Sequence, residues 1–174
     1  MKQPGPQYCV PANLEPGLKE TGLNKLFNVS YTSNSGYLEP MPARILIADD
    51  YEDNRELLRL LLASAKYHVL EAANGRDCLR MAIDEQPDLI LIDLSMPVLD
   101  GWSLFGKLRS DERTERIPCV AVTAHPESDR NKALERGFSA YLTKPFRTAE
   151  LLETVKQLLE QYAPNSISEQ KKTS

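Results

Sequence analysis

Four widely separated parts of the chain carry polar side chains that suit one phosphoryl-transfer site. They are the acidic pair Asp49 and Asp50, the single Asp93, the hydroxyl of Thr123 and the ammonium of Lys144. Each follows a short apolar run that predicts a strand, so the fold is expected to bring the four parts together.

The chemistry of these residue types explains why they belong in one site. Three carboxylates repel one another unless a hard cation neutralises them, and Mg²⁺ prefers carboxylates, waters and phosphate oxygens as ligands. An aspartate can also act as a nucleophile and form a covalent acyl phosphate, which is the role predicted for Asp93. Phosphoryl transfer further needs positioning and charge stabilisation, which Mg²⁺, Lys144 and Thr123 are expected to supply.

Each residue also has an ordinary structural explanation. Adjacent acids such as Asp49 and Asp50 often cap a helix, and Asp93 alone is compatible with a loop acid. Thr123 could simply continue a strand, because threonine favours β structure, and Lys144 could be a surface lysine. The combination favours the chemical interpretation, since Asp93 ends a fully apolar run, where an unpaired charge is costly.

Strand and helix signals alternate five times along the chain, which predicts an α/β fold. Short apolar runs predict strands, which are 44–48, 68–72, 89–92, 119–122 and 139–142. Helical spacing and boundary signals predict helices, which are 53–65, 75–85, 101–109, 127–136 and 148–161. At the helix boundaries, Asp53 with Glu56 resembles a capping box, and Gly137 is placed to end the fourth helix.

This alternation implies a doubly wound parallel sheet of five strands, covered on both faces by five helices. In the flavodoxin-like strand order 2-1-3-4-5, a site lies at the carboxyl ends of strands near the switch between the first and third. Asp49, Asp50 and Asp93 follow those two strands. The fold class and the candidate chemistry therefore predict the same location.

The chain resembles the receiver domain of two-component response regulators, in particular single-domain regulators of the chemotaxis type. The resemblance runs from about Ala43 to Tyr162. It rests on four stretches, which are Ile45–Asp50, Leu89–Pro97 with Asp100-Gly101, Val120–Ala124 and Tyr141–Phe146.

The resemblance implies a role for each acidic residue. Asp93 becomes the phosphoacceptor for a histidine kinase. Asp49, Asp50 and Asp93 bind Mg²⁺ together with the backbone carbonyl of Ser95. The chain is then a phosphoacceptor signalling protein rather than an enzyme, promoting only its own phosphoryl transfer and autodephosphorylation.

Three further positions take implied roles in binding and switching. Thr123 and Lys144 contact the phosphoryl group, and the bond before Pro145 is cis. Tyr141 stands at the position of the family's switch aromatic, which turns inward when Thr123 moves and so reshapes the face made by the fourth helix, fifth strand and fifth helix. The ordinary alternative for Tyr141 is a half-buried strand tyrosine.

Composition limits the remaining possibilities. The net charge is −4, and residues 43–162 carry 16 Lys and Arg against 21 Asp and Glu, so direct nucleic-acid binding is disfavoured. Cys9, Cys78 and Cys119 are too few and too far apart for a disulfide framework, which fits a reducing cytoplasm. The sequence shows neither a membrane-spanning run nor a signal peptide.

The two ends of the chain differ from its centre. Residues 1–42 contain six of the 12 prolines and four of the eight glycines, which predicts a largely disordered arm. Within the arm, Leu18, Leu23, Leu26 and Phe27 could line a short helix that binds a partner or caps the core. Residues 163–174 are expected to form a polar tail, so 43–162 is predicted as the receiver domain.

These features lead to a single-domain response regulator as the expected function. It would accept a phosphoryl group from a histidine kinase or histidine phosphotransfer protein, and signal through a phosphorylation-dependent protein contact or a phosphorelay. Two alternatives stay open. An aspartyl-nucleophile phosphatase usually has a second acid two residues after the nucleophile, where this chain has Ser95, and a receiver-like module without phosphorylation usually lacks an essential residue.

Overall fold

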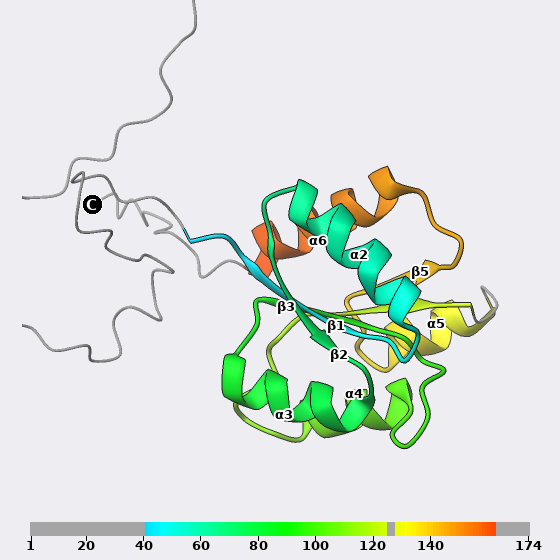
Figure 1. Ribbon diagram of the computed structural model, residues 1–174. Coiled ribbons are helices and arrows are strands. Elements are labelled where there is room, and N and C mark those ends of the chain that lie inside the picture. The colour runs from blue at the N-terminus through cyan, green and yellow to red at the C-terminus, as the bar shows by residue number, and fades with distance from the viewer. Residues whose placement is uncertain (1–40, 125–127, 163–174) are drawn as a thin grey trace, which may run out of the picture. The chain divides into compact units, whose positions relative to one another are not determined.

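A computed structural model describes residues 41–124 and 128–162 and contains the predicted five-stranded sheet (Figure 1). All its strands are parallel and follow the order β2-β1-β3-β4-β5. The flavodoxin-like doubly wound α/β class is therefore confirmed. The strands are β1 (Arg44–Ala48), β2 (His68–Ala72), β3 (Leu89–Ile92), β4 (Cys119–Thr123) and β5 (Ala140–Thr143).

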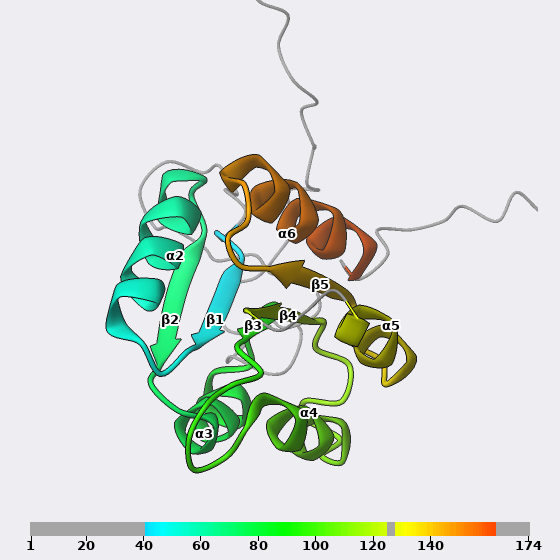
Figure 2. The same ribbon diagram turned by 90° about the vertical axis from the view of Figure 1, so that its right-hand side faces the viewer.

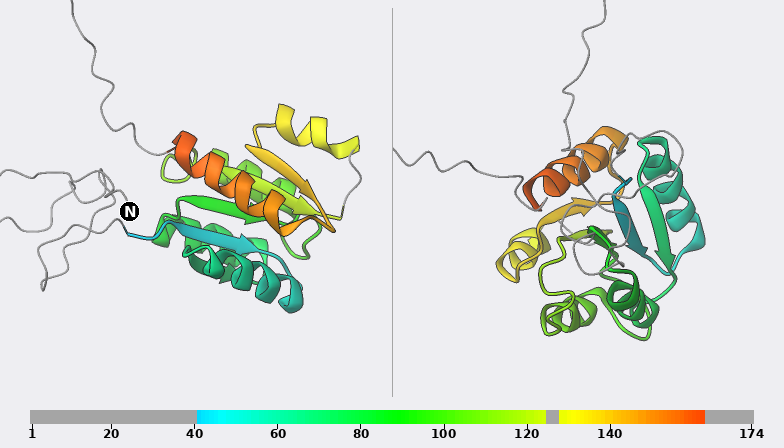
Figure 3. Two further views of the ribbon diagram at one scale, coloured as in Figure 1. Left: turned by 90° about the horizontal axis from the view of Figure 1, so that it is seen from above. Right: turned by 90° about the vertical axis from the view of Figure 1, so that its left-hand side faces the viewer.

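Five helices among the described residues cover the two faces of the sheet. Helices α2 and α6 run beside each other over one face, as the view from above shows (Figure 3). Helices α3, α4 and α5 cover the opposite face (Figure 2). The helices are α2 (Glu52–Ser64), α3 (Gly75–Glu85), α4 (Gly101–Arg109), α5 (Ser128–Glu135) and α6 (Thr148–Tyr162).

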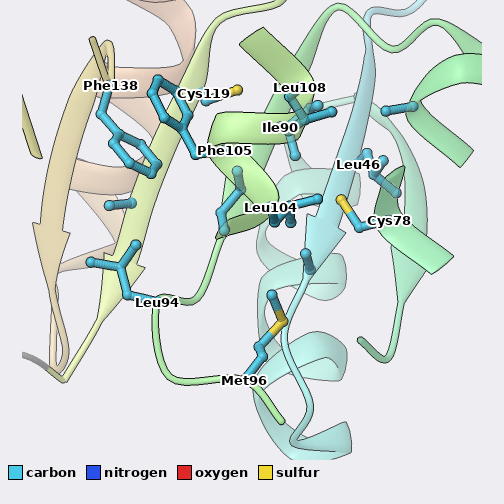
Figure 4. Close-up of a cluster of buried hydrophobic side chains, with 14 of the residues drawn as sticks. Leu46, Cys78, Ile90, Leu94, Met96, Leu104, Phe105, Leu108, Cys119 and Phe138 are labelled. Carbon is cyan, nitrogen blue, oxygen red and sulfur yellow. The ribbon is translucent and has the colours of Figure 1, made fainter. Parts of the chain in front are cut away.

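Strand residues alternate between two hydrophobic cores, one under each layer of helices. The core beneath α3, α4 and α5 contains Leu46 and Ile90 of the central strands, and Phe105 stacks on Phe138 with ring centroids 3.9 Å apart (Figure 4). The core beneath α2 and α6 takes the alternate strand residues, such as Ile45. Because β1, β3 and β4 are buried on both faces, their sequences are nearly continuous apolar runs, with Arg44 at the start of β1 and Thr123 at the end of β4 as the exceptions.

The register of β1 and β3 sets the position of the acidic residues. Ala48, the last residue of β1, pairs with Ile92, the last residue of β3. The N–H of Asp93 then donates to the carbonyl of Ala48 over 2.8 Å. Asp49 and Asp93 therefore leave adjacent strands at the same edge of the sheet.

Of the two helix-boundary predictions, the one at Gly137 is confirmed and the one at Asp53 is wrong. The structure also shows a cap that was not predicted, in which the side chain of Asn74 accepts the N–H of Asp77 at the start of α3. After α5, Gly137 has φ +102°. Its N–H donates to the carbonyl of Leu134, and the N–H of Phe138 donates to the carbonyl of Ala133, as in a Schellman cap. The capping box at Asp53 is wrong, because α2 begins one residue earlier and its N-cap is Tyr51, which makes no side-chain cap.

The predicted arm 1–42 and tail 163–174 lie outside the described residues, apart from positions 41 and 42. The limits of the receiver domain at 43 and 162 stay a prediction for the same reason. Within 41–124 and 128–162, no helix has the length and apolar character needed to cross a membrane.

Candidate functional site

Three carboxylates meet at the carboxyl edge of the sheet. Asp49 and Asp50 follow β1 and Asp93 follows β3, and each offers an oxygen within 4.8 Å of the others. Asp49 is 1% exposed and Asp93 is 7% exposed, so both carboxylates are largely removed from water. The structure thus brings together the three acids that the sequence singled out.

Asp49 is fixed by the first turn of α2. Its Oδ1 accepts the N–H of Tyr51 over 2.9 Å, and the amide of Asn54 lies 3.2 Å from both carboxylate oxygens. The Arg55 guanidinium donates to the main-chain carbonyl of Asp49 over 2.9 Å. Sequence reasoning missed Asn54 and Arg55, and their only signal was their place in the first turn of the helix that follows the acids.

Lys144 lies between two of the carboxylates. Its ammonium donates to Asp49 Oδ2 over 2.5 Å and to Asp93 Oδ2 over 2.7 Å. Burial alone would lower the pKa of Lys144, but the hydrogen bonds to Asp49 and Asp93 and their charges outweigh it, so the pKa is raised and the ammonium is retained at neutral pH. The Lys144–Pro145 peptide bond is cis, as the family resemblance implied.

The loop after Asp93 is packed tightly against it. Oδ1 of Asp93 accepts the N–H of Ser95 over 2.9 Å, while the side chain of Ser95 is exposed. A Cβ at Gly101 would lie 2.4 Å from the carbonyl oxygen of Asp93, so glycine alone fits the start of α4 in this position. The close approach fixes the backbone that carries Asp93.

Charge in the cluster is not balanced by the residues of 41–124 and 128–162 alone. Three ionised carboxylates carry three negative charges, and Lys144 contributes one positive charge. The neighbouring Arg55 is paired with Glu71, with 3.7 Å between Nε and Oε2. Oδ1 of Asp50 is buried and has no hydrogen-bond partner in the described part of the chain. Oxygen ligands with an excess of about two negative charges suit a hard divalent cation such as Mg²⁺.

The switch candidates are both buried. Thr123 is the last residue of β4, where it pairs with Thr143, and it is 0% exposed. The N–H of Lys144 donates to the Thr123 carbonyl over 2.8 Å, which links the ends of β4 and β5. Tyr141 is 2% exposed and belongs to the core beneath α3, α4 and α5, so it is more deeply buried than the half-buried strand tyrosine of the alternative.

An apolar groove opens beside Lys144. It has a volume of about 340 Å³ and lies between α2 and the loop that joins β5 to α6, lined by Asn54, Leu57, Leu58, Lys144, Pro145 and Phe146. Leu57 is 52% exposed and lies on α2, the helix that also carries Asn54. The acidic cluster therefore has a hydrophobic surface directly next to it.

Comparison with protein families gives one domain over most of the described chain. The model described as the response regulator receiver domain matches residues 45–156. The response regulator PleD of Caulobacter vibrioides is 42% identical over 119 residues, which are 68% of this chain and 26% of PleD. The polar-differentiation response regulator DivK of Brucella anthropi is 33% identical over 120 residues, 68% of this chain and 98% of DivK.

Solved structures agree with this match. The receiver domain of a sensor histidine kinase from Pseudomonas aeruginosa PAO1 is 34% identical, with a TM-score of 0.64. The alignment covers 68% of this chain and 98% of that domain, whose structure has a magnesium ion coordinated in the active-site cleft. The chain is thus similar both to relatives of one domain's length and to part of longer proteins.

Proposed function

Because the chain belongs to the response regulator receiver domain family, we propose that Asp93 accepts a phosphoryl group from a histidine kinase or a histidine phosphotransfer protein. One observation carries the proposal: the Lys144 ammonium binds Asp93 and Asp49 at once, inside a cluster of three acids. The ammonium of such a lysine can bind the Asp93 carboxylate before transfer and the oxygens of the attached phosphoryl group after it.

The proposed transfer is a single displacement at phosphorus. An Oδ atom of Asp93 forms the new O–P bond while the P–N bond of the donor's phosphohistidine breaks. The electron pair of that bond stays on the imidazole nitrogen. Lys144 stabilises the charge on the phosphoryl oxygens, and the N–H of Ser95 holds the other carboxylate oxygen in place.

The acidic cluster supports Mg²⁺ as the metal of this site. Asp49, Asp50 and Asp93 would hold it together with the backbone carbonyl of Ser95. The ion would supply charge neutralisation for the carboxylates and the phosphoryl oxygens. The buried and unpartnered Oδ1 of Asp50 supports this assignment, because a buried carboxylate oxygen without a donor is costly unless a ligand satisfies it.

Signalling is proposed to run through Thr123 and Tyr141. Both side chains are buried on neighbouring strands, where Tyr141 pairs with Ala121, two residues before Thr123, so a movement of Thr123 toward the phosphoryl group would change the space around Tyr141. Phosphorylation shifts this equilibrium only if it stabilises one arrangement over the other. The surface that responds is the one made by α5, β5 and α6, which would bind the downstream target.

The groove beside Lys144 is proposed to receive the phosphodonor protein. Leu57 and Leu60 of α2 are 52% and 54% exposed, and the groove adjoins the lysine that touches Asp93. An amphipathic helix could lay its apolar face there and bring its phosphohistidine to the site. Leu57→Glu should then slow transfer from a phosphohistidine protein but not from a small acyl phosphate, with Leu134→Glu on α5 as the control.

We further propose that the chain works as a single-domain regulator in the cytoplasm, by protein contact or phosphorelay, rather than as an enzyme acting on a separate substrate. Ser95 supports this, because a hydroxyl at that position cannot replace the acid of an aspartyl phosphatase. The acidic balance of residues 43–162 speaks against direct nucleic-acid binding. Turnover of a phosphate ester, measured as released phosphate, would contradict the proposal.

The proposed phosphoacceptor is tested by intact mass. The protein is incubated with Mg²⁺ and a small acyl-phosphate donor, next to Asp93→Asn and to a reaction with chelator. We expect one added phosphoryl group in the wild type with Mg²⁺, and none in either control. Equal labelling of wild type and Asp93→Asn would falsify the assignment of Asp93.

A further inference from the structure

The loop that joins β3 to α4 holds an apolar residue in a strained and exposed position. Val98 has φ +70°, and its side chain is 78% exposed. The N–H of Leu99 donates to the carbonyl of Pro97 over 2.8 Å, which closes a γ-turn around Val98. A β-branched residue is a genuine outlier in this region of backbone conformation.

The packing on both sides of Val98 imposes this conformation. A Cβ at Gly75 would lie 2.3 Å from the carbonyl oxygen of Leu99, so the loop presses directly on the start of α3. On the other side, Asp100 caps α4 by accepting the N–H groups of Trp102 and Ser103. Both ends of the turn are fixed, and Val98 is directed toward solvent. Strain that the surroundings maintain at an exposed residue points to a binding role.

Val98 forms one wall of a groove between α3 and α4. The groove has a volume of about 290 Å³, and Leu79 and Leu99 contribute its other apolar walls. Arg76 of α3 and Lys107 of α4 complete the lining. The two helices lie side by side on one face of the sheet (Figure 2). The lining residues place the groove between these helices and the loop that precedes α4.

The two cations of the groove are free to bind an anion. Neither the Arg76 guanidinium nor the Lys107 ammonium forms an ion pair or hydrogen bond with another residue of 41–124 or 128–162, whereas the guanidinium of Arg80, one turn further along α3, pairs with Asp77 over 3.6 Å. Arg76 lies in an acidic part of the sequence, because residues 41–100 contain six Lys and Arg and 12 Asp and Glu. Carboxylates on a partner would complement this pair of charges.

We propose that the groove of Arg76, Leu79, Val98, Leu99 and Lys107 binds a short acidic segment of a partner protein, with a bulky apolar side chain seated between flanking carboxylates. Two cations around an apolar floor suit a peptide better than a nucleic acid, whose backbone requires a row of positive charges. This surface lies apart from α2 and from the α5, β5 and α6 face. Its binding does not depend on the proposed phosphoryl transfer.

The test is peptide binding by fluorescence anisotropy. The probe is a fluorescein-labelled peptide with two central leucines flanked by glutamates, compared with the same peptide carrying glutamines. We expect the glutamate peptide to bind at least about tenfold more tightly, and the Arg76→Gln/Lys107→Gln double variant to lose that advantage. Arg80→Gln removes one positive charge from the same helix outside the groove and should bind as the wild type does.

A second variant separates binding from folding. Val98→Gly relieves the backbone strain, so it should raise the midpoint of urea unfolding while weakening peptide binding. A protein that is more stable and binds less cannot be explained by misfolding. The proposal is overturned by equal affinity for the two peptides, by an unchanged affinity in the double variant, or by no binding up to about 1 mM peptide.

Discussion

Replacing Asp50 by asparagine should make the metal-free protein more stable. The substitution keeps the shape of the side chain and removes one charge from a cluster in which three carboxylates offer oxygens within 4.8 Å of one another. An asparagine amide can also donate a hydrogen bond to a neighbouring carboxylate. The cluster is therefore expected to lower stability in exchange for function, as active sites often do.

The size of the effect follows from the geometry. Two unit charges 4.8 Å apart repel by about 3.5 kcal/mol at an effective dielectric constant of about 20, and Asp50 faces two such partners. The Lys144 ammonium, bound to both of those partners, offsets about one of these repulsions. Solvent screening at the half-buried Asp50 reduces the rest, so we expect Asp50→Asn to stabilise the metal-free protein by about 1–2 kcal/mol.

Urea unfolding with EDTA and with Mg²⁺ measures this effect. A ligand that binds only the folded state at about 100 times its Kd adds about 2.7 kcal/mol, and the wild type should gain most of this from Mg²⁺. Asp50→Asn should gain much less. The variant should therefore be more stable than the wild type in EDTA, and equally or less stable than the wild type in Mg²⁺. Asp53→Asn, an exposed acid in the first turn of α2, should leave the response to Mg²⁺ unchanged.

Two results would refute this reasoning. If Asp50→Asn is less stable than the wild type in EDTA, Asp50 supports the fold and is not a repelled member of a charge cluster. If both proteins gain equally from Mg²⁺, the ion binds elsewhere.

Three further outcomes follow from the geometry of single residues. Lys66→Gly should stabilise the protein by about 0.5–1 kcal/mol, measured by urea unfolding, because Lys66 has φ +70° just after α2; an unchanged midpoint would show that the strain is relieved in another way. Gly101→Ala should destabilise by about 2 kcal/mol or more in the same assay, since its Cβ meets the main chain of Asp93, and it should also slow phosphorylation; a neutral variant would mean that the loop can move aside. Burial raises the pKa of Cys119 to about 11 and that of Cys78 further, so both thiols should resist alkylation in the native state near pH 8 and react in denaturant, as mapped by peptide mass; rapid native labelling would contradict their burial.

The strands and the edge of the sheet were predictable because burial on both faces leaves a direct mark on the sequence. Leu89–Ile92 is entirely buried and entirely apolar, and the polar residue that follows it marks the strand end. The same pattern located the end of β1, whereas β4 and β5 each end one residue later than predicted. Once the strand order is given, the positions of Asp49, Asp93 and Lys144 at one edge follow.

The first turn of α2 was harder to predict because the site itself shapes it. The pattern of Asp53 and Glu56 is typical of a capping box, yet the N–H of Tyr51 is bound by the carboxylate of Asp49 and the helix begins at Glu52. An acid of the candidate site thus replaces part of the usual cap. Sequence rules for helix caps do not predict that a carboxylate before the helix binds the N–H of the N-cap residue.

Tertiary contacts determine the remaining features. Lys144 binds Asp49 across 95 residues of sequence, and no local pattern shows that one ammonium serves two carboxylates. The left-handed conformations of Lys66 and Val98 are likewise imposed by their surroundings, since neither residue type favours it. Only the folded arrangement identifies these positions.

Locating the phosphoryl group on the chain tests the central claim most directly. After reaction with phosphohistidine protein or a small acyl phosphate, borohydride reduction converts an aspartyl phosphate into homoserine, which peptide sequencing by mass spectrometry places at a single position. We predict homoserine at position 93 in the wild type. We predict no homoserine in the Asp93→Asn variant. Homoserine at position 49 or 50, or a stable phosphate on Ser95, would contradict the account.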